Sequence, residues 1–146
     1  MARVSGSIVV DRPIEQVFEF LANGENDKKF SPRIIEMTRT PDGPVGVGTV
    51  WVSTARDLGR TARHEIEITE FEPPKRIRWA ERSGGPVVIV DGGYDLQPEG
   101  GGTRVSLYGE LRGRGPGVLV APLVAWIYQR KAPALAASIK RAIEAE

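Results

Sequence analysis

Residues 61–71, TARHEIEITEF, contain the clearest structural signal in the sequence. In this stretch His64, Ile66 and Ile68 alternate with charged or polar residues. Because successive side chains of a β-strand point to opposite faces, a period of two predicts a strand with one apolar and one solvated face. Strands of this kind are typical of antiparallel sheets, in which one face covers the core.

The alternation continues on both sides of this stretch and is interrupted by turn sequences. After a short β-branched strand at residues 4–10, extended runs are predicted at 33–39, 48–56, 61–71, 76–82, 87–97 and 103–112. Segments rich in Gly, Pro and Asp, such as residues 40–43 and 98–102, separate the runs and provide turns. The sequence therefore predicts an antiparallel meander with about seven strands.

Helical periodicity is confined to the two ends of the chain. Apolar residues at helical spacing predict a short helix at residues 14–21, and the polar stretch that follows allows at most one more short helix. After a glycine-rich break at 113–117, large apolar residues recur at helical intervals to the C-terminus and predict one long helix: Leu119, Leu123, Ile127, Leu135, Ile139 and Ile143. The apolar run at 118–128 fits a helix buried against the sheet or one that touches a membrane, and we expect the buried arrangement.

Composition narrows the function classes. The 146 residues fit one domain, 1–146, and 20 basic against 19 acidic side chains leave no basic stripe for nucleic acid. The N-terminus lacks an apolar signal core, and no apolar run approaches the roughly 20 residues that span a bilayer, so we expect a cytoplasmic protein without stable membrane insertion. With no cysteine, one histidine and no nucleotide fingerprint, we expect no cofactor and no transition metal, while carboxylate-only calcium or magnesium binding stays open.

Four local sequences carry a family resemblance: DRPIEQVF at 11–18, VGVGT at 45–49, ITEFEPPKRI at 68–77, and YDLQP with GTRV at 94–105. With the order of predicted elements, the chain resembles the polyketide cyclase/dehydrase branch of the START-like, Bet v 1-like (SRPBCC) superfamily over essentially its whole length. The resemblance implies an α+β helix-grip fold, in which a curved antiparallel sheet wraps around a long C-terminal helix with short helices after the first strand. It also implies a cavity between sheet and helix.

The strand phase predicts which side chains line this cavity. If His64, Ile66 and Ile68 face inward, alternation and the closing helix give these ligand-binding candidates: Trp51, His64, Ile66, Ile68, Ile77, Trp79, Val90, Tyr94, Leu107, Leu123, Trp126 and Ile127. Trp51 fits core filling and ligand contact equally well, whereas Trp79 alternates in phase with Ile77. A bulge at Gly92-Gly93 would reverse the phase locally.

Three polar residues in this wall are catalytic candidates: His64, Glu81 and Tyr94. Together they offer an acid, a base and a hydroxyl for enolate chemistry. Each also has a simpler interpretation. His64 is then a hydrogen-bonded wall residue, Glu81 a solvated carboxylate at a strand end, which we favour, and Tyr94 a ligand contact that fixes orientation.

The predicted function is binding or transport of a small hydrophobic ligand of the lipid, polyketide or isoprenoid type. An alternative is a polyketide aromatase/cyclase or dehydratase that uses the same cavity, because shape alone can bring reacting carbons together. A further alternative is a protein-interaction module, as in co-chaperone-like relatives. We expect a monomer or a homodimer.

Overall fold

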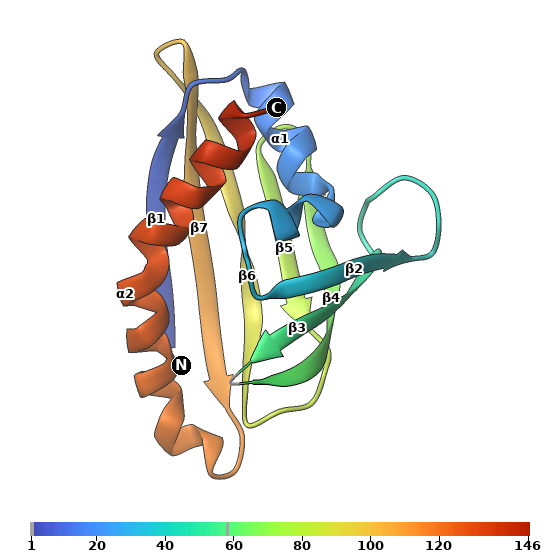
Figure 1. Cartoon of the computed structure of the whole chain (residues 1–146), viewed down its shortest axis with the longest axis vertical. Coiled ribbons are helices and arrows are strands. Elements are labelled where there is room, and N and C mark those ends of the chain that lie inside the picture. Colours follow the sequence, from blue (N-terminus) through green and yellow to red (C-terminus); the bar gives the residue numbers. More distant parts are fainter. Residues whose placement is uncertain (1, 58) are drawn as a thin grey trace.

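The computed structural model describes residues 2–57 and 59–146. Its elements follow one another along the chain as β1 (Ala2–Val10), α1 (Ile14–Ala22), η1 (Gly24–Lys29), β2 (Ile34–Thr40), β3 (Val50–Asp57), β4 (Arg60–Glu72), β5 (Arg76–Glu81), β6 (Val87–Glu99), β7 (Gly102–Gly113) and α2 (Gly117–Glu144). The strands form one antiparallel sheet in the order β1-β7-β6-β5-β4-β3-β2 (Figure 1). The predicted α+β fold with a seven-stranded sheet and a long C-terminal helix is confirmed.

Every predicted strand is present, with ends that differ from the prediction by at most two residues. The closing helix runs without interruption, although Pro122 and Pro133 both lie inside it. Turns follow the predicted Gly- and Pro-rich segments, except that β6 continues through Pro98 and Glu99, which pair with Thr103 and Gly102.

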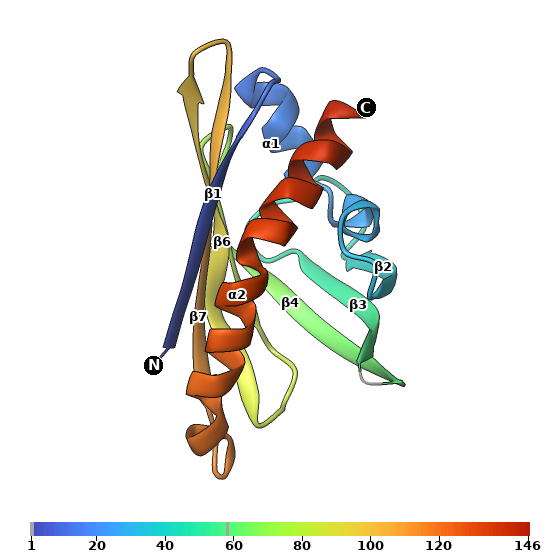
Figure 2. The ribbon, with the colours of Figure 1, turned by 60° about the vertical axis from the view of Figure 1, so that its left-hand side comes forward.

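The sheet curves strongly, as Figure 2 shows, where β3 and β4 leave the plane of β1, β6 and β7 and extend away from these strands to the right. Register shifts accompany the curvature, at 34/36 in β2, 68/70 in β4 and 89/91 in β6. Extra residues of this kind bend a strand and increase its twist. The suggestion of a bulge at Gly92-Gly93 is wrong, because both glycines pair in register with β5 and β7. The register shift in β6 lies earlier, at Val90.

The helix α2 lies across β1, β7 and β6. The side chains that it buries are mostly small, namely Ala121, Ala125, Ala132 and Ala136, with Ile139 and Ile143 near its C-terminal end. A Cβ added to Gly6 of β1 would lie 3.4 Å from the Cβ of Ala132, so helix and strand backbones approach closely. Large side chains do not fit between them, and the alanine face of α2 is therefore the face that packs on the sheet.

Polar contacts hold α2 along the free edge of β1. The Gln129 amide accepts a hydrogen bond from the Ser5 amide at 2.9 Å and donates one to the Ser5 carbonyl at 2.8 Å. The Lys140 ammonium donates to the Val9 carbonyl at 3.1 Å, and the Asp11 amide donates to the Glu144 carboxylate at 2.8 Å. These bonds satisfy backbone groups that an edge strand otherwise leaves open.

Candidate functional site

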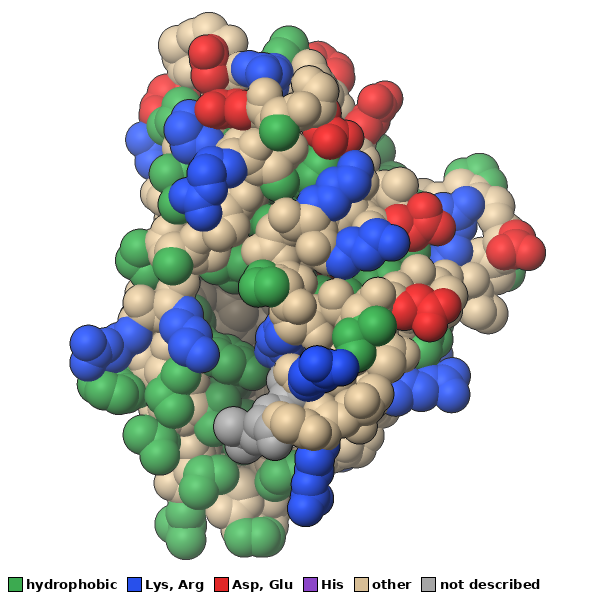
Figure 3. Space-filling view, viewed as in Figure 1, with side chains coloured by type: hydrophobic (Ala, Val, Ile, Leu, Met, Phe, Trp, Pro, Cys, Tyr) green, Lys and Arg blue, Asp and Glu red, His purple; other side chains and the backbone are tan. Residues whose placement is uncertain are grey.

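A hollow lies beside α2, on the side where the sheet curves away from it. In Figure 3 it opens between the helix and the η1–β2 region, over the middle of the sheet. The space exists because α2 packs on β1 and β7 while β3 and β4 bend out of their plane. The predicted space between helix and sheet is thus an open hollow on this face of the molecule.

Cross-strand pairs put the predicted wall residues of β4, β5 and β6 on the concave face. Ile66 pairs with Glu81, Ile68 with Trp79, and Ile77 with Tyr94. Directly paired residues of antiparallel strands share a face, so this series follows one side of the sheet. Leu107 continues it on β7, as the partner of Tyr94 and of Gly6.

The wall residues differ in how much surface they leave for a ligand. Ile68 and Ile77 are 4% and 2% exposed and fill the core, whereas Ile66, Trp79 and Leu107 are only partly buried and pack against that core. Val90 is also partly buried and is unpaired at the β6 bulge. A ligand in the hollow would therefore contact Ile66 and Trp79 rather than Ile68 and Ile77, which lie beneath them.

Trp51 belongs to the core. Its side chain is 3% exposed, and the Arg39 guanidinium lies 5.9 Å from the centre of its ring. A Cβ on Gly24 would come within 2.7 Å of the indole, so the start of η1 closes directly over it. Of the two interpretations open for Trp51, this position supports core filling.

Trp79 has the more open position, and a glycine makes room for it. A Cβ on Gly92, its cross-strand partner, would lie 2.9 Å from the indole nitrogen. The ring meets the Tyr94 ring edge to face at a centroid distance of 5.2 Å. This aromatic pair provides a rigid apolar surface at the floor of the concave face.

His64 and Glu81 form a hydrogen-bonded pair on the same face. The His64 Nδ1 atom lies 2.9 Å from Glu81 Oε2, and the two side chains are 29% and 14% exposed. Glu81 Oε2 also accepts from the Ser83 hydroxyl at 2.7 Å, and Oε1 accepts from the Ile89 amide at 3.4 Å. The expectation that Glu81 is a solvated strand-end carboxylate is wrong, because its phase on β5 turns it inward, where these donors surround it.

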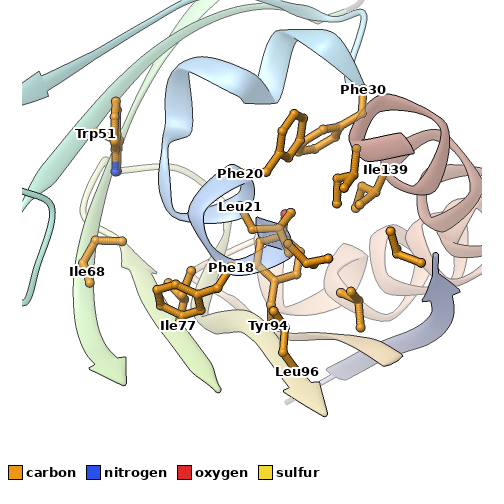
Figure 4. Packing of buried hydrophobic residues seen from close by; sticks show 14 of the residues in the cluster. Phe18, Phe20, Leu21, Phe30, Trp51, Ile68, Ile77, Tyr94, Leu96 and Ile139 are labelled. Atoms are coloured by element: carbon orange, nitrogen blue, oxygen red, sulfur yellow. The ribbon is translucent and has the colours of Figure 1, made fainter. Parts of the chain in front are cut away.

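Tyr94 lies deeper in the molecule. Figure 4 shows its ring among Phe18, Leu21 and Ile139, between α1 and α2, and its side chain is 8% exposed. Burial, together with the negative charge of Asp27, raises the Tyr94 pKa far above its ordinary value. The phenol therefore keeps its proton and acts as a hydrogen-bond donor or a neutral ligand contact.

The three catalytic candidates do not form one centre. Tyr94 pairs with Ile77, which is four residues along β5 from Glu81, so the backbones are about 13 Å apart at the ~3.3 Å rise of a strand. The structure brings His64 and Glu81 together and leaves Tyr94 in the buried core cluster between α1 and α2. Ser83 joins the His64–Glu81 pair, and its position in a Gly-rich turn gave no sign of this role.

Asp27 was also missed by the sequence-based predictions. Its carboxyl lies on η1 near Tyr94, and burial raises its pKa to about 7. The surrounding sequence, GENDKK, is polar and resembles an ordinary surface turn. Only the packing of η1 onto the concave side of the sheet puts this carboxyl in a poorly solvated place.

On α2 the predicted ligand contacts Leu123, Trp126 and Ile127 lie on the exposed outer side of the helix. They are 56%, 56% and 37% exposed, and Leu123 lies about 200° around the helix from the buried Ala121, on the side away from the sheet. The preference for a buried apolar run at 118–128 is wrong for the same reason. The small side chains of that run face the sheet, and its large ones face outward.

Other α2 residues face the hollow. Gln129 marks the flank of α2 over the β1 edge, and Tyr128, about 100° away around the helix, lies on the opposite flank. Leu135, seven residues later, lies on that flank too. They are 37% and 39% exposed. Tyr128 and Leu135 therefore lie on the flank of α2 next to the hollow.

Two further depressions lie elsewhere on the described surface. One, of about 380 Å³, is lined mainly by charged and polar side chains around Glu72, Arg76 and Asp95. The other, of about 240 Å³, lies between α1 and the end of α2 and includes Phe20 and Ile143. Neither contains a predicted ligand-binding residue, so the hollow beside α2 is the candidate site.

The fold defines the class of protein: a curved antiparallel sheet that holds a long C-terminal helix, the Bet v 1-like helix-grip arrangement. Residues 1–142 match the family model described as polyketide cyclase/dehydrase and lipid transport, and the chain belongs to this family. No curated protein sequence matches the chain.

Solved structures support the same fold. The protein TTHA0849 from Thermus thermophilus is 22% identical with a TM-score of 0.78, and the match covers 98% of this chain and 97% of that one. The Zhui aromatase/cyclase from Streptomyces sp. R1128 is 16% identical with a TM-score of 0.77, covering 97% and 93%. The Aha1 dimer from Colwellia psychrerythraea is 18% identical with a TM-score of 0.66, covering 99% and 97%.

The described residues contain no helix long and apolar enough to cross a membrane.

Proposed function

We propose that the chain binds or carries a small hydrophobic molecule, of the lipid, polyketide or isoprenoid type, in the hollow between α2 and the concave face of the sheet. The observation that carries the proposal is the partly exposed aromatic and aliphatic surface of Ile66 and Trp79. Across the hollow, Tyr128 and Leu135 give the helix side the same character. Membership of a family described by cyclases and lipid transport supports this use of the space.

The geometry of the hollow suits an apolar ligand with one polar end. The partly exposed indole of Trp79, held edge to face against the Tyr94 ring, offers a flat surface for a planar or polyene body. The His64–Glu81 pair lies farther along the same face and offers hydrogen bonds to a carbonyl or hydroxyl. Sites of this kind bind through apolar area and orient the ligand through a few polar groups.

A matched pair of leucines on α2 tests the proposal. Leu135→Ala shortens a side chain that faces the hollow, whereas Leu123→Ala makes the same change on the outward side. With N-phenyl-1-naphthylamine as a fluorescent probe, we expect Leu135→Ala to weaken binding roughly five-fold and Leu123→Ala to leave it unchanged. Equal effects of the two substitutions on probe binding, or a loss only in Leu123→Ala, would show that the probe does not bind in the hollow.

A second candidate function, a polyketide aromatase/cyclase or dehydratase, is favoured by one observation, the His64–Glu81 hydrogen bond of 2.9 Å in the wall of the hollow. A carboxylate that accepts the Nδ1 proton orients the imidazole and makes Nε2 its basic nitrogen. This nitrogen would remove a proton from a methylene between two ketone groups. The resulting enolate carbon would then bond to a distal carbonyl carbon, whose oxygen takes up a proton.

His64→Gln tests this candidate on an unreduced poly-β-ketone. We expect a loss of cyclised product relative to the spontaneous background, with probe binding retained. The neighbouring Arg63→Gln is the control, because Arg63 points to the opposite face of β4. An unchanged product distribution in His64→Gln would exclude this chemistry for the pair and leave ligand binding intact.

A further inference from the structure

The N-terminal half of α2 exposes large apolar side chains on the described surface. We name this surface the α2 tip and define it by Val118, Leu119, Val120, Leu123, Trp126 and Ile127. Their exposed fractions run from 37% for Ile127 to 85% for Leu119. In Figure 3 hydrophobic side chains follow the lower part of α2 to the end of the molecule. An exposed cluster of six large apolar side chains indicates an interaction surface.

Packing of the preceding turn holds the tip in place. The Arg114 amide donates to the Pro86 carbonyl at 2.8 Å, and the Gly117 amide donates to the Arg114 carbonyl at 2.8 Å. Gly115 adopts a φ of +55°, and a Cβ on Gly117 would lie 1.8 Å from the Pro86 carbonyl oxygen. The helix therefore starts from a tight turn packed on the β5–β6 connection, with its apolar side chains projecting outward.

The charged residues that flank the tip in the sequence are all basic. The chain as a whole is nearly balanced, at +1, but residues 111–143 contain no Asp or Glu and carry these cations: Arg112, Arg114, Arg130, Lys131, Lys140 and Arg141. Arg114 precedes the tip, and Arg130 and Lys131 follow it, all exposed. The Arg130 guanidinium lies 4.9 Å from the centre of the Trp126 ring. Figure 3 shows basic side chains beside this part of α2, with the acidic ones near its C-terminal end and near β2.

We infer that the α2 tip docks on the surface of an anionic lipid bilayer. The tip combines projecting aliphatic side chains and an indole with flanking basic residues. This combination is typical of surfaces that bind at a membrane interface. The apolar tip enters the headgroup–acyl boundary while Arg114, Arg130 and Lys131 meet lipid phosphates and carboxylates. A bilayer needs no complementary pocket for side chains that project this far.

A second copy of the chain fits the tip less well. In a symmetric dimer the same patch faces itself, which would bring the Arg114, Arg130 and Lys131 of one copy against those of the other. Like charges at an interface oppose association. The inference concerns a surface distinct from the hollow and does not depend on which ligand the hollow holds.

Co-sedimentation with vesicles tests the inference. Wild-type protein is mixed with vesicles of phosphatidylcholine alone or with about 30% phosphatidylserine. We expect binding to the anionic vesicles, weaker binding to the neutral ones, and a loss of the difference at high salt. A blue shift of Trp126 emission on binding, absent in Trp126→Phe, would show that the tip itself enters the lipid. Failure to bind anionic vesicles would overturn the inference.

A matched pair of valines provides the control. Val118→Glu puts a charge into the tip, and Val47→Glu makes the same change at a loop residue that is 69% exposed, against 59% for Val118. We expect Val118→Glu to weaken vesicle binding about ten-fold or more and Val47→Glu to leave it unchanged. Equal effects would overturn the assignment to the tip, as would a concentration-dependent dimer that Val118→Glu abolishes. Probe binding in the hollow should persist in both variants, which separates this test from that of the proposed function.

Discussion

The His64 imidazole and the Glu81 carboxylate, which come from neighbouring strands, lie 2.9 Å apart on the concave face of the sheet. Glu81 is the centre of this arrangement, since it also accepts hydrogen bonds from Ser83 and from the Ile89 amide. Its carboxylate thereby ties β5 to β4 and to the bulged start of β6. The pair is a structural link as well as a polar group available to a ligand.

Glu81→Ala should lower the free energy of unfolding by about 1–3 kcal/mol, because it leaves several hydrogen-bonding groups without their acceptor. Chemical denaturation measures this change. Glu67→Ala on β4 is the control, since Glu67 lies on the opposite face and its contact with Arg82 is a 3.6 Å pair between largely solvated side chains. A loss no larger than that of Glu67→Ala would contradict the structural role of Glu81.

Gly92→Ala should displace the Trp79 indole. The added methyl group would lie 2.9 Å from the indole nitrogen and 3.0 Å from the Ile89 side chain, and overpacking of this kind costs about 1–3 kcal/mol. Gly109, the β7 partner of Gly92, is a close control because its Cβ would lie 4.0 Å from the nearest heavy atom, in Val4. Thermal unfolding and tryptophan emission should change in Gly92→Ala and stay near wild type in Gly109→Ala. Similar unfolding of both variants would argue against the close Gly92–Trp79 contact.

Asp27 should make stability fall as pH rises towards neutrality. Its pKa is raised from 3.8 to about 7 by burial, so between these values the folded state binds a proton that the unfolded state has released. Folding is therefore favoured at low pH by this group, and the advantage disappears as pH increases through about 7. Asp27→Asn should remove this pH dependence and stabilise the protein by about 2 kcal/mol near pH 8.

Urea denaturation at about pH 5 and about pH 8 measures the effect of Asp27. Asp42→Asn is the control, since Asp42 lies exposed in the turn after β2. If the wild type and Asp27→Asn lose stability equally between the two pH values, the raised pKa is not a property of Asp27.

Gln129→Ala should loosen the edge of β1. The substitution removes both hydrogen bonds to the Ser5 backbone, at about 1 kcal/mol for each, and alanine otherwise suits the helix. Hydrogen exchange of the Ser5 amide should accelerate, while core amides of β6 change little. Gln16→Ala, an exposed position on α1, is the control. An unchanged Ser5 exchange rate would mean that the side chain does not protect this edge.

Local sequence was sufficient for the strands, because period-two alternation and turn residues act within a few residues of one another. The phase of β4 and β5, with Ile66, Ile68, Ile77 and Trp79 on one face, followed from the same alternation and agrees with the observed pairing. The phase of early β6 did not follow, since the bulge at Val90 depends on how that strand curves against its neighbours.

What the amino-acid sequence determined by itself was the secondary structure, the antiparallel meander and the apolar character of the concave face. Tertiary structure alone decided which side of α2 is buried. Hydrophobicity favoured Leu123 and Ile127, but α2 approaches β1 closely at Ala132 and Gly6, and up to this point its buried side chains are alanines. The large residues Leu123 and Ile127 therefore face outward. Likewise, only the packing of η1 and the bend of the sheet put Asp27 near Tyr94 and Glu81 against His64, because those contacts join segments far apart in the chain.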